Sequence, residues 1–134
     1  MAGSRYTYAY RLDGPRPAAG GGPITITAGV NDFIPFREEI SGPNGAAIAP
    51  GVYADATALA AAVQATLNAS VNDQLFAVTV VGGALQLTRA TQVFVLLWAS
   101  SAAPRAVPTA IKLGWPGDAD VGPSLSELAP GPPV

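Results

Sequence analysis

The stretch YADATALAAAVQATLN, residues 53–68, is the only part of the sequence with a plain helical pattern. Its apolar stripe, which repeats every four residues, consists of Leu59, Val63 and Leu67. The alanines between them raise helix propensity and keep the helix slim enough to lie close to a sheet. Asp55 suits the N-cap, because its carboxylate can accept hydrogen bonds from the first free amides. We therefore predict one packed helix over about residues 55–69.

Around this helix, short segments alternate apolar and polar residues with the two-residue period of β-strands. The predicted strands cover residues 5–13, 24–27, 33–40, 46–48, 75–81, 84–90 and 93–98. Gly82-Gly83 predicts a hairpin turn, and Pro43-Asn44-Gly45 predicts another. Pro35 favours an edge strand or a bulge.

Two later segments carry further information about the fold. Residues 93–98 are apolar on both faces, which predicts a central strand covered on both sides. Residues 107–113 fit either a helix or a strand, and Pro108 would suit a helical start.

The elements together predict a single α+β domain, mostly β, built as an antiparallel sheet or sandwich with one packed helix. Residues 14–23 are rich in proline and glycine, which predicts a linker that follows an N-terminal strand. The end of the sequence is acidic and rich in proline. We therefore expect an arm with its linker over residues 1–22, a core over 23–117, and an extended tail over 118–134. We expect that tail to become ordered only against a neighbour.

The composition excludes several classes of function. Only 12% of the residues are charged and 49% are hydrophobic, which suggests that other subunits cover much of the surface. A surface of neutral polar residues is the alternative. The absence of Cys and His removes disulfides, thiolate nucleophiles, common zinc sites and imidazole chemistry. The net charge is −2 and the seven basic residues are scattered, so we expect no nucleic-acid partner. We also expect no membrane span and no signal peptide.

The acidic residues and tryptophans do not predict a catalytic or metal site. Glu38 and Glu39 are neighbours on a strand and point to opposite faces, so we interpret them as solvated strand charges. Asp118 and Asp120 could contribute to a Ca²⁺ site but lack the remaining oxygen ligands, which favours a polar loop. The two tryptophans, Trp98 and Trp115, could stack on a sugar ring; their apolar neighbours favour a core or an interface.

The order of motifs resembles a known module. The sequence contains GVY at residues 51–53, LAAAVQATLN at 59–68, FAVTVVGGALQLT at 76–88, FVLLW at 94–98 and AIKLGW at 110–115. This order and spacing, over about residues 24–118, resembles a module of structural proteins of tailed bacteriophages, which occurs in tails, fibres and head decorations. Trp115 stands where phenylalanine is commoner in that pattern. The resemblance implies a small β-rich domain packed into a virion, without catalytic residues or a cofactor.

We therefore expect a non-enzymatic structural subunit of a tailed-phage virion, made in the host cytoplasm. Its expected partners are copies of itself and other virion proteins. The alternative is a module of a fibre or tail tip that binds a receptor or a host-surface glycan. A small hydrolase would need converging carboxylates, which the sequence does not predict. The candidate interface residues are aromatic or apolar: Tyr6, Tyr8, Tyr10, Trp115, Leu125 and Leu128. For the three tyrosines, the alternative is a sheet face packed within their own domain.

Overall fold

The computed structural model describes residues 22–38, 43–71 and 75–134 of the chain. Its strands are β2 (Ile24–Ile26), β3 (Phe33–Glu38), β4 (Pro43–Ala47), β5 (Gly51–Tyr53), β6 (Phe76–Val81), β7 (Ala84–Arg89), β8 (Phe94–Leu96), β9 (Val121–Ser124) and β10 (Ser126–Leu128). Its helices are α1 (Ala56–Ala69) and α2 (Ala106–Leu113). The described pairings are all antiparallel, which confirms the predicted α+β, mostly β, class.

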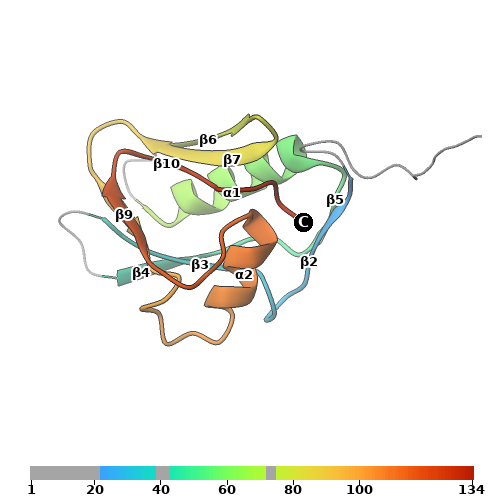
Figure 1. Cartoon of the computed structure of the whole chain (residues 1–134), viewed down its shortest axis with the longest axis horizontal. Coiled ribbons are helices and arrows are strands. Elements are labelled where there is room, and N and C mark those ends of the chain that lie inside the picture. Colours follow the sequence, from blue (N-terminus) through green and yellow to red (C-terminus); the bar gives the residue numbers. More distant parts are fainter. Residues whose placement is uncertain (1–21, 39–42, 72–74) are drawn as a thin grey trace, which may run out of the picture.

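The last two strands link the two larger sheets. One sheet has the order β4-β3-β8-β9, another has the order β10-β7-β6, and a small one pairs β2 with β5. Because β9 pairs with β8 and β10 pairs with β7, the chain changes sheets at Leu125. The Leu125 carbonyl accepts a hydrogen bond from the Arg89 amide at 2.8 Å, which continues the pairing through the bend. In Figure 1, β6, β7 and β10 lie above α1, β3 and β4 lie below it, and β9 runs between the two layers.

Helix α1 forms as the sequence predicts. The Asp55 carboxylate caps it by accepting a hydrogen bond from the Ala58 amide at 2.9 Å. The stripe of Leu59, Val63 and Leu67 is fully buried. These three side chains belong to the cluster of buried residues that joins both larger sheets, so the helix is anchored mainly by apolar burial.

Polar side chains of α1 also bond to strand edges on both sides of the helix. On the β6 side, Gln64 accepts a hydrogen bond from the Val78 amide at 2.9 Å. Asn68 accepts one from the Phe76 amide and donates one to the Phe76 carbonyl, each at 3.0 Å. On the β4 side, the Thr66 hydroxyl donates to the Ala47 carbonyl. The helix therefore closes the gap between the outer edges of the two sheets.

The hairpin of β6 and β7 confirms its predicted turn. Gly82 and Gly83 have φ values of 58° and 85°, a left-handed pair that suits the twist of a two-residue hairpin. The next strand, β8, lies between β3 and β9, and its three residues are buried. The prediction of a central apolar strand is therefore also confirmed.

The turn predicted at Pro43-Asn44-Gly45 is wrong, because these residues belong to β4. Gly45 serves a packing purpose: a Cβ atom there would lie 2.4 Å from the ring of Phe33 on the neighbouring strand. The edge position predicted for Pro35 is also wrong, because β3 lies between β4 and β8. The Pro35 carbonyl accepts a hydrogen bond from the Leu97 amide at 2.8 Å. Proline has no amide hydrogen to donate in return, but Pro35 lies just beyond the end of the β3–β8 pairing, so this pairing tolerates it.

The C-terminal segment is integrated into the fold and does not form the predicted tail. Residues 121–128 supply β9 and β10, and beyond them the Ala129 amide bonds to the Leu85 carbonyl at 2.9 Å. The prediction that residues 118–134 order only against a neighbour is therefore wrong. The open edges of β7 and β8 supply partners within the same chain. Residues 106–113 form a second helix, α2, so the prediction of a single helix was incomplete.

The core extends across both larger sheets and both helices. At its centre the Phe76 ring packs edge-on against Phe36, with 5.6 Å between ring centroids, and against Phe94, with 5.3 Å. These three rings come from β6, β3 and β8, so the two sheets share one core.

Candidate functional site

A buried ion pair joins the two larger sheets. Nη2 of Arg89 on β7 lies 2.5 Å from Oε2 of Glu38 on β3, and the side chains are 0% and 11% exposed. The Arg89 guanidinium also lies 4.8 Å from the centroid of the Phe76 ring. The interpretation of Glu38 as a solvated strand charge is therefore wrong. The pair links the two sheets, and Glu38 is engaged in this structural contact.

A second ion pair fixes the start of α2. Nη1 of Arg105 lies 2.9 Å from Oδ1 of Asp32, and the guanidinium lies 4.8 Å from the centroid of the Phe33 ring. One turn later, the buried Thr109 hydroxyl accepts a hydrogen bond from the Phe33 amide at 3.0 Å. These contacts attach α2 to β3, and they engage the Asp32 carboxylate in a structural ion pair.

Asp120 acts as a cap for a turn. Its Oδ1 accepts hydrogen bonds from the Ala99 and Ser100 amides, each at 2.9 Å, and its Oδ2 accepts one from the Ser100 hydroxyl. Partial burial raises the pKa of this carboxyl, but the hydrogen bonds from Ser100 and Ala99 and the charge of Arg37 outweigh that effect and lower the pKa below its usual value. The carboxylate thus stays charged to stabilise the turn.

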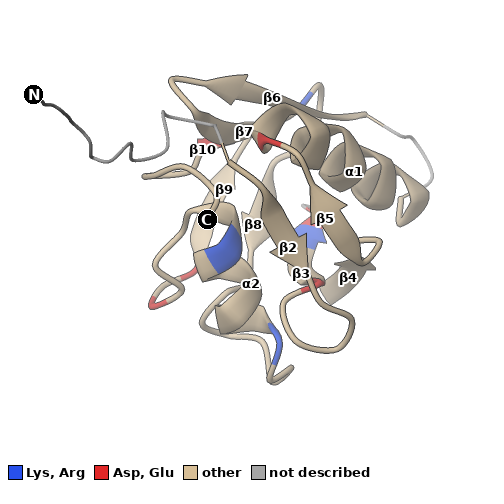
Figure 2. Ribbon diagram, turned by 90° about the vertical axis from the view of Figure 1, so that its right-hand side faces the viewer, with Lys and Arg blue, Asp and Glu red and all other residues tan. Residues whose placement is uncertain are grey.

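The acidic residues in the described part of the chain do not converge on a common point. Within residues 22–38, 43–71 and 75–134, no group of three or more His, Cys, Asp and Glu side chains could hold a metal ion. Figure 2 shows the charged residues separated around the ribbon. Asp32, Glu38, Asp55 and Asp120 each have the structural partner described above.

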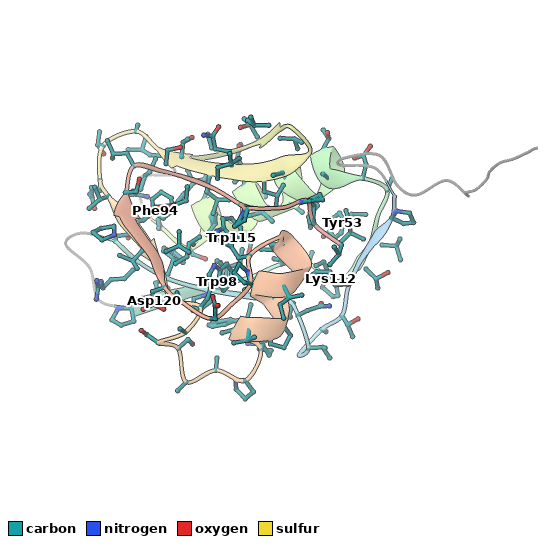
Figure 3. The ribbon with its side chains drawn as sticks, in the orientation of Figure 1. Tyr53, Phe94, Trp98, Lys112, Trp115 and Asp120 are labelled. Carbon is teal, nitrogen blue, oxygen red and sulfur yellow. The ribbon has the colours of Figure 1, made fainter. Side chains whose placement is uncertain are left out.

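Both tryptophans lie in the interior. Trp98 is 1% exposed and Trp115 is 3% exposed, and their ring centroids are 5.8 Å apart. Figure 3 shows Trp98 and Trp115 near each other beside α2. Trp115 is therefore a core residue, and its prediction as an interface residue is wrong. The same burial removes both rings as a platform for stacking on a sugar.

Among the described residues, no charged side chain belongs to the outer face of the β10-β7-β6 sheet. Its rows follow the strand register: Ser126 pairs with Thr88 and Thr88 with Ala77, while Leu128 pairs with Gln86 and Gln86 with Thr79. We call this surface the uncharged sheet face; its exposed and half-buried members are Ala77, Thr79, Val81, Gln86, Thr88, Ser126 and Leu128.

Two of the predicted interface residues lie on or beside this face. Leu128 is 48% exposed within it, and Leu125 is 45% exposed at the bend where the chain changes sheets. Val81, which the sequence did not single out, is 46% exposed at the other end of the sheet. The three predicted tyrosines, Tyr6, Tyr8 and Tyr10, lie outside the described residues.

Two of the hollows that described residues line lie elsewhere on the surface. Among the described residues, a cavity of about 260 Å³ is lined by Arg37, Glu38, Val93, Val95 and Pro123. A groove of about 470 Å³ runs between α1 and β6, lined by Thr57, Ala60, Ala61, Gln64, Val78, Thr79 and Val80. None of the described residues that line this groove is charged.

Comparison with known proteins adds no family to these observations. The chain matches no protein-family model, no curated protein and no solved structure. Among the described residues, no helix is long and apolar enough to cross a membrane.

Proposed function

We propose that this protein is a non-enzymatic structural subunit of a tailed-phage virion, as a tail, fibre or capsid-decoration component. It assembles with copies of itself and with other virion proteins after synthesis in the host cytoplasm. The observation that carries the assembly part is the uncharged sheet face with its exposed Leu128 and the neighbouring Leu125. Two such faces can meet without opposing like charges or burying an unpaired one. The virion part rests on the motif order over residues 24–118.

The alternative, a receptor- or glycan-binding module, requires exposed aromatic rings near polar groups. Trp98 and Trp115 are buried, and the Tyr53 hydroxyl bonds to the Ala49 carbonyl at 2.5 Å. These observations favour assembly over glycan binding for the described part of the chain.

Native mass spectrometry across a dilution series tests the proposal. A discrete trimer, pentamer or hexamer is expected, and electron micrographs of the assembled material should show closed rings or stacked tubes. A monomer at every concentration, with no rings or tubes, would contradict it.

A further inference from the structure

The edge of β6 is capped by α1 at two successive outward positions. Because backbone groups of an edge strand alternate in direction, the outward-facing amides of β6 belong to Phe76, Val78 and Val80. Asn68 bonds to the first and Gln64 to the second, as described above. Gln64 and Asn68 are four residues apart on the helix, which matches the two-residue step along the strand.

The third outward-facing amide of β6, that of Val80, is not capped by α1. Four residues before Gln64 stands Ala60, which has no polar side chain. No side chain of the described residues bonds to the Val80 backbone, and Thr57, Ala60 and Ala61 leave the groove of about 470 Å³ opposite it. The groove therefore offers one strand-edge pairing position with an apolar floor of small side chains. Such a site suits an extended, uncharged peptide segment that carries large side chains.

The chain itself contains a segment of this kind. YTYAY, residues 6–10, alternates tyrosine with small residues and has no charge, as the groove lining has none. Three tyrosines on one face could fill the space above Ala60 and Ala61, and burial would leave no charge unpaired. Residues 1–21 lie outside the described part of the structure.

The position of the first described residues bears on which copy supplies the segment. Ile24 pairs with Tyr53, which comes just before α1, so the chain enters the domain beside the end of the groove that Thr57 lines. Residues 14–23 contain three prolines, and this spacer in extended form spans about 30 Å. A domain of this size has a radius of gyration of only about 13 Å. A spacer of this length can carry residues 6–10 past the groove of their own chain and reach a neighbouring subunit.

We propose that the α1–β6 groove binds residues 6–10 of a second copy of this chain, with one backbone contact at Val80 and tyrosine rings against Ala60 and Ala61. This interface rests on the proposed assembly function and names one of its contacts. Because each subunit gives one arm and offers one groove, the contact is either exchanged reciprocally in a two-fold dimer or repeated head-to-tail in a ring or a filament.

Disulfide trapping in the full chain tests this contact, because the protein has no cysteine of its own. Tyr8→Cys chains, isotopically labelled, are mixed with unlabelled Ala61→Cys chains under mild oxidation. The matched control is Ala65→Cys, another exposed position on α1 that does not line the groove. A mixed disulfide dimer is expected with Ala61→Cys at several times the yield obtained with Ala65→Cys.

Three results would overturn the proposal in different ways. Equal yields with the two helix positions, or no dimer with either, would exclude the groove as the binding site. In a Tyr8→Cys/Ala61→Cys double variant, a disulfide formed mainly within one chain would assign the groove to its own arm. If trapping gives one of these results while the unmodified protein still forms a discrete oligomer in native mass spectra, only the arm contact is contradicted and the proposed assembly function stands. If it stays monomeric, the proposed function fails as well.

Discussion

Arg89 and Glu38 form an ion pair at 2.5 Å between strands of different sheets, and the Arg89 side chain is fully buried. The pair lies beside the Phe76 ring, which also contacts Phe36 and Phe94 of the four-stranded sheet. One polar contact and one aromatic cluster therefore act at the same junction. Because both side chains are largely withdrawn from water, each charge contributes to the stabilisation of the other.

A double-mutant cycle on this pair should show strong coupling. Glu38→Leu removes the carboxylate from a buried guanidinium and should cost about 3–5 kcal/mol of unfolding free energy. Arg89→Met should cost less, since the Glu38 side chain is 11% exposed and borders a cavity through which water can reach it. The double variant should be more stable than Glu38→Leu alone, measured by urea denaturation. Additive costs would contradict the coupling.

Gly114→Ala should be strongly destabilising, at about 3 kcal/mol or more. Gly114 has a φ of +108°, and a Cβ there would lie 2.2 Å from the Gly131 carbonyl oxygen. Gly29→Ala is the matched control, because Gly29 has a φ of +75° with nothing within 4 Å, and it should cost only about 1 kcal/mol. Equal costs in urea denaturation would mean that the contact with Gly131 is unimportant.

Asp120→Asn should change the pH dependence of stability. The hydrogen bonds that lower the pKa of Asp120 stabilise its charged form, so its contribution is fully present above the unfolded-state pKa of about 3.9 and is lost as the pH falls through the lower folded-state pKa. Wild type should exceed the variant by up to about 1 kcal/mol at pH 7, since solvent screens this partly exposed group. The difference should shrink below about pH 3.9. A constant difference across the pH range, in thermal or urea unfolding, would contradict this account.

Leu128→Lys should weaken assembly and leave folding nearly unchanged. The side chain is 48% exposed on the uncharged sheet face, so folding stability should change by no more than about 0.5 kcal/mol. A lysine there would place like charges opposite each other where two faces meet. Sedimentation velocity should show a lower average mass than wild type. Ile111→Lys, on a 51% exposed position of α2, is the control and should keep the wild-type mass; equal losses would argue against this face.

Elements with local determinants were predictable from the sequence. The α1 cap and stripe, the Gly82-Gly83 turn and the apolar β8 run each depend on residues that are close in the chain. The spacing of Gln64 and Asn68 was also visible, but its meaning depends on the position of β6, which the sequence alone does not give.

Features that depend on distant partners were not predictable. Gly45 is required by the Phe33 ring across the pairing, although Pro-Asn-Gly is typical of a turn. The burial of Trp115 depends on Trp98 and the core around it. The C-terminal strands have a proline-rich sequence that favours irregular structure, and they form because β7 and β8 offer open edges.

The change of sheet at Leu125 links folding to the order of translation. β9 and β10 are the last of the described strands to leave the ribosome, yet β8 and β7 pair with them. Until residue 128 has emerged, the nascent chain exposes two strand edges that can pair with other chains. The domain therefore closes only after nearly all of it has been synthesised. A chain truncated before Leu125, such as one released after ribosome stalling, would therefore be prone to aggregation.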